Sequence, residues 1–175
     1  MKQITHPEAA PLIERVERLL ADPETALALG AALRARAAGA PDELVLAALL
    51  HQVAAGGTGE PRVAAAWLSR AFGPAVSEPV RLLGDAERWL ATVDRDWFEA
   101  LDTAGLTSLG ARGGPLAPAA QRSFERRPYA RDAARLVRWI SAERRGEAHP
   151  LGAPEHVSWA ELIDRLVSPT ERLSA

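Results

Sequence analysis

The chain contains no cysteine among its 175 residues, which excludes disulfide bonds, thiolate metal sites and cysteine nucleophiles. Neither sign of charge dominates, because 21 Lys and Arg residues are set against 23 Asp and Glu residues. The formal net charge of -2 creates no field that would attract nucleic acid or an anionic membrane surface. The sequence also lacks a signal-peptide pattern and any apolar run of the roughly 20 residues that cross a bilayer. We therefore expect a soluble, cytoplasmic protein that binds neither nucleic acid nor membrane.

Signals for β-strands are scarce, whereas helix signals recur along the chain. Capping boxes, in which Ser or Thr is followed three residues later by Glu, stand at Thr5 and Ser158. Apolar spacing and the positions of Pro and Gly predict helices over about residues 5–20, 22–39, 41–56, 60–72, 76–92, 94–101, 118–126, 128–145 and from 158 onward. The segment Glu43–Leu50 is apolar almost all the way round, which is typical of a helix at the centre of a domain. No repeat and no linker interrupts the pattern, so residues 1–175 are predicted to form one all-α domain.

The most informative segment spans residues 39–52, with the sequence G-A-P-D-E-L-V-L-A-A-L-L-H-Q. It resembles the G-A-x-D-E-L-V-x-A-A-L-L-H-D stretch of HD-domain proteins, which use the final His-Asp pair to hold metal. His51 retains the histidine of this pair, but Gln52 stands where the aspartate would be. A neutral amide cannot supply an anionic bridge between two cations, so this change predicts altered metal chemistry.

Three later stretches make the resemblance more specific. Residues 72–82, F-G-P-A-V-S-E-P-V-R-L, are similar to the F-G-P-A-V-x-E-P-V-R-L-H run of phosphonate-degrading HD-domain oxygenases. These are mixed-valent di-iron enzymes related to myo-inositol oxygenase. Residues 108–118 resemble the family's S-L-A-L-Q-G-G-P-M-S-P, and residues 124–139 resemble its F-x-x-x-P-Y-A-x-D-A-x-x-L-R-R-W-D pattern. The similarity covers about residues 23–143 and implies an HD-domain-like helical bundle.

The same resemblance implies that the metal site has been lost. The family's first histidine falls on Leu27, the histidine after V-R-L falls on Leu83, and the late aspartate falls on Ile140. The segment that supplies another histidine is shortened, with Glu60 in place of a His-Glu pair. A pair of irons needs several oriented donors and a bridge. We therefore expect neither a metal centre nor another cofactor.

Two charged positions distinguish the chain from the family in substrate recognition. Glu87 stands where the family has a Lys that favours an anionic phosphonate, and Arg112 stands where it has Gln. One hypothesis is that the two side chains pair, or that together they hold a zwitterionic or polar ligand. A carboxylate among leucine and isoleucine side chains would have a raised pKa, which suits a general acid or base. The alternative is a satisfied ion pair of Glu87 with Arg112, Arg81 or Arg88 at the pocket rim.

His51 is the second candidate for catalysis. An imidazole titrates near neutrality, so His51 could act as a metal-free general base while Gln52 orients a substrate carbonyl. The alternative is a core histidine that packs the end of its helix. The predicted substrate pocket takes in further positions, mostly from the family pattern: Gln52, Glu60, Arg112, Ser108, Tyr129, Trp139, Leu27, Leu83 and Ile140.

Two functions are compatible with these residues. The first is a metal-independent enzyme that uses His51 and Glu87 for an isomerisation, cyclisation, elimination or hydrolysis of a small molecule, for example in secondary metabolism. The second is a catalytically inert protein that binds a small molecule or a partner subunit. In both cases the expected partner is a small-molecule ligand or substrate, and the sequence is also compatible with a homodimer. A working oxygenase or phosphohydrolase would need metal ligands that the sequence does not provide.

Overall fold

The computed structural model describes residues 13–14, 26–52, 61–148 and 158–167, and all regular elements in these ranges are helices. The helices are α2 (Ala26–Ala37), α3 (Asp42–Leu50), α4 (Pro61–Phe72), α5 (Pro74–Arg81), α6 (Leu83–Val93), α7 (Arg95–Glu99), α8 (Thr103–Ala111), α9 (Pro118–Glu125), α10 (Ala130–Arg144) and α11 (Trp159–Leu166). The prediction of an all-α protein is confirmed, and the arrangement is consistent with an HD-like bundle. The helix expected over residues 5–20 lies almost wholly outside the described ranges.

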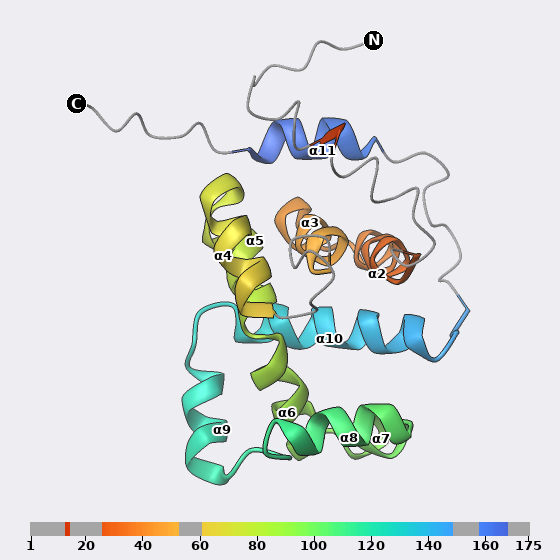
Figure 1. The fold of residues 1–175 in the computed structure, drawn as a ribbon, viewed down its shortest axis with the longest axis vertical. Coiled ribbons are helices and arrows are strands. Elements are labelled where there is room, and N and C mark those ends of the chain that lie inside the picture. The colour runs from red at the N-terminus through yellow and green to blue at the C-terminus, as the bar shows by residue number, and fades with distance from the viewer. Residues whose placement is uncertain (1–12, 15–25, 53–60, 149–157, 168–175) are drawn as a thin grey trace, which may run out of the picture.

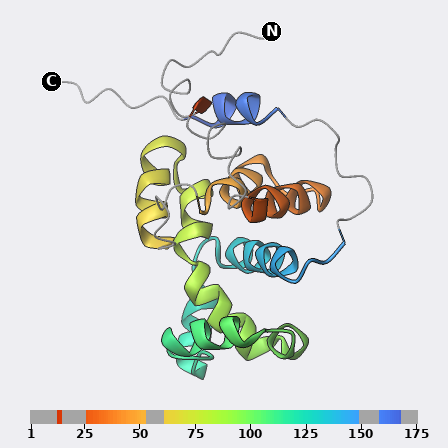
Figure 2. The ribbon, with the colours of Figure 1, turned by 45° about the vertical axis from the view of Figure 1, so that its right-hand side comes forward.

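The helix α3 occupies the centre of the bundle because its residues are apolar on every side. All seven residues from Leu44 to Leu50 are buried, and α3 packs against α2, α5, α10 and α11. Figures 1 and 2 show α2 and α3 as a middle layer between α11 and α10, with α4 and α5 along one side. The helices α6 to α9 form a further layer beyond α10. The C-terminal end of α3 therefore lies inside the fold, where His51 follows it.

Two helix boundaries and one whole helix differ from the sequence prediction. The single helix expected over 76–92 is two helices, α5 and α6, separated by a bend at Leu82 with φ -88° and ψ -1°. The helix α8 was not predicted, because its segment is rich in Gly and Thr. Asp102 caps it by accepting a hydrogen bond from the backbone N–H of Gly105 at 2.7 Å. The helix α3 ends at Leu50, before Gly56.

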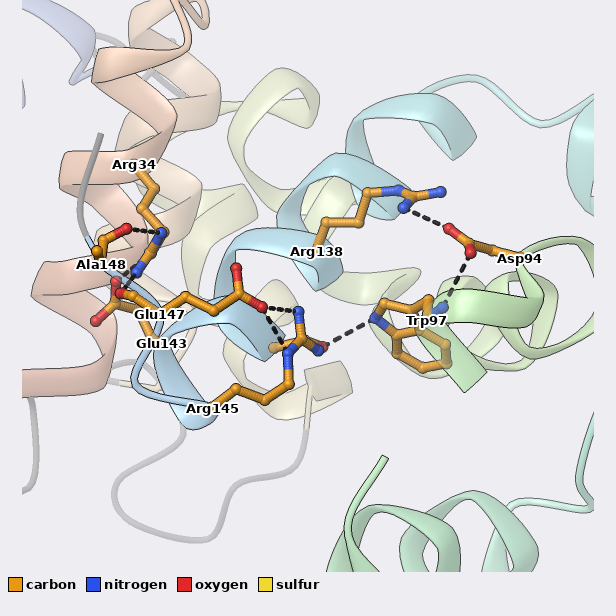
Figure 3. A network of polar contacts seen from close by, with 9 residues as sticks. Arg34, Asp94, Trp97, Arg138, Glu143, Arg145, Glu147 and Ala148 are labelled. Atoms are coloured by element: carbon orange, nitrogen blue, oxygen red, sulfur yellow. Dashed lines mark hydrogen bonds and ion pairs between the residues drawn. The ribbon is translucent and has the colours of Figure 1, made fainter. Parts of the chain in front are cut away.

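A buried arginine ties the end of α10 to α2, as Figure 3 shows. Arg34 on α2 pairs with the carboxylate of Glu143, and it donates to the backbone carbonyls of Glu147 and Ala148. Gly30 leaves room for this contact, because a Cβ there would lie 2.1 Å from Oε2 of Glu143. A buried guanidinium is tolerated only when its donors find acceptors, and all three contacts serve that need.

A second set of polar contacts joins α10 to α7. The indole Nε1 of Trp97 donates to Oγ of Ser141 at 3.2 Å, inside the protein. Asp94 caps α7 through the backbone N–H of Trp97 and also pairs with Arg138 at 2.5 Å. These contacts fix the layer of α6 to α9 against the rest of the bundle. In the part of the chain that is described, no helix has the length and apolar character needed to span a bilayer.

Candidate functional site

His51 follows the last turn of α3 and is buried, with 8% of its surface exposed. Its Nδ1 lies 2.7 Å from the backbone carbonyl oxygen of Ala48. Because a carbonyl oxygen can only accept a hydrogen bond, Nδ1 carries the ring proton and Nε2 presents a lone pair. Among the described residues Nε2 has no hydrogen-bond partner, and the same is true of Oε1 of Gln52. The end of α3 therefore holds two buried acceptors, and each requires a donor.

The protonation state of His51 follows from its surroundings. Burial lowers the pKa of His51 to about 4; the hydrogen bond to Ala48 opposes this change, and the positive charge of Arg144 adds to it. The imidazole is therefore neutral at pH 7. It can accept a proton or a hydrogen bond at Nε2, but it does not present a positive charge to a ligand.

Glu87 lies in α6, and its side chain is 20% exposed. Arg112, which follows α8, forms an ion pair with it, and the same guanidinium nitrogen donates to Oγ of Ser108 at 2.8 Å. The pairing of Glu87 with Arg112 that the sequence suggested is confirmed. Burial still raises the pKa of Glu87, against the opposing effects of Arg112 and Arg144. Desolvation therefore outweighs the neighbouring positive charges at this carboxylate.

The positive charge of Arg144 acts on both candidate catalytic residues, and Arg144 is not among the residues predicted from the sequence. Its charge lowers the pKa of His51 and opposes the rise in the pKa of Glu87, so both side chains lie within its field. Arg144 is in the last turn of α10, four residues after Ile140, and residues four apart share one face of a helix. That spacing was a signal that could have placed Arg144 beside the position of the family's late aspartate.

The apolar positions implied by the family pattern occupy the core. Leu83 and Ile140 are buried, and Leu27 is half-buried and packs against the same core cluster. None of these side chains has an atom that can bind a metal ion. The described residues contain no group of three or more His, Cys, Asp or Glu side chains that could hold one. The side chains at these positions therefore do not fit the di-iron centre that the resemblance implies.

The remaining predicted residues lie in different surroundings. Tyr129 precedes α10 with φ 63°, a left-handed conformation that is unusual for a residue with a side chain. Trp139 is half-buried beneath the guanidinium of Arg135, 5.1 Å from the ring centroid. It lines a cleft of about 710 Å³ formed by residues of α2, α7 and α10. Glu60 lies outside the described residues. The ligand-binding roles of these three residues remain predictions.

Comparison with known proteins supports a distant relationship to an oxygenase. No family model matches the chain. The chain is 33% identical over 126 residues to a hydroxymethylphosphonate dioxygenase of Gimesia maris. The match covers 64% of this chain and 63% of the relative, which is less than two thirds of the relative's length. It supports the resemblance to the HD-domain oxygenase family at low identity.

Proposed function

We propose that this chain is an enzyme that acts on a small polar molecule by acid/base chemistry without a metal ion, with His51 as the proton acceptor. The observation that carries the proposal is the buried, neutral imidazole whose Nε2 lacks a partner among the described residues. A primary amine of a substrate, or a hydroxyl together with a second donor, would satisfy this lone pair and the neighbouring Oε1 of Gln52. A base that stays unprotonated down to about pH 4 is weak, so it suits a substrate proton that is already acidic.

Glu87 is the second catalytic group in this proposal. Its raised pKa suits a residue that exchanges a proton with the substrate, and Arg112 holds the carboxylate in a defined position. Proton transfer at His51 and Glu87 would serve an isomerisation, cyclisation, elimination or hydrolysis. Arg144, whose charge acts on both residues, would favour negative charge that develops on the substrate.

Loss of the metal chemistry is part of the same proposal. The relative's name describes a dioxygenase that acts on a phosphonate, whereas Leu27, Leu83 and Ile140 offer this chain no donor atoms. A role in a biosynthetic pathway, such as secondary metabolism, would suit a scaffold whose chemistry has changed in this way. A cytoplasmic location also remains a proposal.

A second candidate function is supported by the ion pair itself. Arg112 engages the carboxylate of Glu87 and so competes with a substrate for it. If this pair persists when a ligand binds, the protein binds a small molecule or a partner subunit without converting it. The two candidates differ only in whether the bound molecule is chemically changed.

The test combines metal analysis with a search for turnover. Untagged protein, grown with added iron, is incubated with fractionated cell extract, and products are followed by mass spectrometry beside the His51→Gln and Glu87→Gln variants. We expect substoichiometric metal and a conversion that falls by about 10²-fold or more in the His51→Gln variant. A ligand that binds but is never converted would favour the second candidate. Near-stoichiometric iron, or conversion unaffected by either substitution, would overturn the proposal.

A further inference from the structure

An arginine-lined cleft lies where α4 and α5 meet α6 and the segments that follow α8 and α9, and neither His51 nor Glu87 lines it. Its volume is about 740 Å³, within the range of roughly 300–1,000 Å³ that is usual for small-molecule sites. The lining residues come from five segments of the chain: Pro61, Arg62, Glu78, Arg81, Gly84, Asp85, Arg88, Arg112, Arg127 and Pro128. Five of them are arginines and two are carboxylates, and Arg112 is already paired with Glu87, so two positive charges are left over. The whole chain carries a net charge of -2, so this excess is local to the cleft.

The two carboxylates in the cleft do not close it to a ligand. Glu78 pairs with Arg81 and Asp85 pairs with Arg127, and all four side chains are between 30% and 45% exposed. Exposed ion pairs of this kind contribute little to stability, about 0–1 kcal/mol each. An anion with several charges can therefore displace these carboxylates from their arginines at small cost.

Arg88 is held in place as a donor. Its Nε donates to the backbone carbonyl of Gly114 at 2.8 Å, and the residue is half-buried. Among the described residues, both terminal nitrogens of Arg88 and the whole guanidinium of Arg62 have no hydrogen-bond or carboxylate partner. A guanidinium whose orientation is already fixed loses less conformational entropy when it binds an anion. Arg88 and Arg62 therefore offer free donors on a wall of the cleft.

We propose that this cleft binds a ligand with two or more linked phosphoryl groups, such as the chain of a di- or triphosphate. An arginine fork binds two oxygens of a phosphate side by side, and a single phosphate cannot offer such pairs to five guanidiniums. A chain of linked phosphates extends the acceptors across the cleft. The site is separate from the buried acceptors at the end of α3, and it does not depend on the function proposed above.

Arg112 links this cleft to Glu87, because it lines the cleft and also holds the carboxylate of Glu87. A phosphate chain that attracts Arg112 competes directly with the carboxylate of Glu87. Occupation of the cleft would therefore release Glu87 from its ion pair.

Calorimetric titration of the full chain with tripolyphosphate tests the proposal. At low salt we expect saturable binding that is at least tenfold tighter than that of orthophosphate, and that weakens as salt is added. The Arg62→Ala/Arg88→Ala double variant is expected to lose at least tenfold in affinity. Arg95→Ala is the matched control, because Arg95 pairs with Glu99 on α7 and does not line the cleft. It should bind as the wild type does.

Two further measurements distinguish a bare phosphate chain from a nucleotide and test whether the cleft is independent of His51. If ATP binds as tightly as tripolyphosphate, the cleft recognises the phosphate chain alone. If ATP binds more tightly, the cleft also contacts the nucleoside. Either result supports the site. The His51→Gln variant should bind tripolyphosphate like the wild type, even if it lacks activity. Absence of saturable binding, equal affinity for orthophosphate, or full binding by the Arg62→Ala/Arg88→Ala variant would overturn the proposal.

Discussion

Acid is expected to destabilise the fold through His51. Its pKa is 6.5 in an unfolded chain and about 4 in the folded protein, because burial disfavours the charged ring. Above pH 6.5 the ring is neutral in both states and contributes no pH dependence. Between pH 6.5 and 4 the unfolded chain binds a proton that the folded protein refuses, so the free energy of unfolding falls as pH falls. Below about pH 4 both states are protonated and the loss stops growing.

The size of this effect follows from the two pKa values. A difference of about 2.5 pH units, at about 1.4 kcal/mol for each, corresponds to roughly 3 kcal/mol of stability lost between pH 7 and pH 4. This loss is a measurable fraction of the total free energy of unfolding of a typical domain, which is about 5–15 kcal/mol. Most of the loss should be present at pH 4.5.

Denaturant unfolding at pH 7.5, 6.5, 5.5 and 4.5, for the wild type and the His51→Gln variant, measures the effect. Glu78 and Asp94 also lose stabilising contacts in acid. Hydrogen bonds lower the pKa of each, chiefly from Arg81 and from the backbone N–H of Trp97. These contributions, and those of the other three histidines, cancel in the difference between the two proteins. By pH 4.5 the wild type should lose about 2–3 kcal/mol more than the variant. Parallel losses in the two proteins would refute the assignment of a buried, neutral His51.

Three substitutions, one of them a control, test the packing around the candidate site and at the end of α10. Arg112→Ala should destabilise the protein by about 1 kcal/mol at pH 8 and by less at pH 5, since protonation in acid relieves the unpaired carboxylate of Glu87. A larger loss at pH 5 than at pH 8 would contradict the raised pKa of that carboxyl group. Gly30→Ala should cost about 2 kcal/mol, because its Cβ displaces the Glu143 carboxylate from a buried partner. Gly110→Ala, with open space around its Cβ, should gain up to about 1 kcal/mol in a thermal melt; equal effects at both glycines would show that the contact at Gly30 is unimportant.

The local sequence was sufficient to predict most of the helices but not every helix boundary. Apolar spacing is a local property, so the central position of α3 followed from residues 44–50 alone. The bend at Leu82 was missed because apolar spacing continues across it, and the turn depends on where α6 packs beneath α10. The helix α8 was missed because its glycines and threonines disfavour helix, while the cap at Asp102 and its place in the layer of α6 to α9 stabilise it.

Part of the candidate site could likewise be predicted from the sequence, and part could not. The family resemblance pointed to His51, and the change of charge at two positions suggested the contact between Glu87 and Arg112. The sequence could not show that His51 is neutral, because its pKa depends on how completely neighbouring helices bury the ring. Nor could it show that Arg144, from the far end of α10, places its charge near both catalytic candidates.

The sequence by itself therefore determined the all-α class, the central helix and the residues worth testing, because hydrophobic periodicity and motif spacing act along the chain. Apart from the contact between Glu87 and Arg112, the tertiary structure alone decided which distant charges meet. The arginine-lined cleft gathers guanidiniums from segments between Arg62 and Arg127, and no local pattern brings such distant side chains together. Electrostatic energies depend on distance and burial in space, and the packing of the helices sets both.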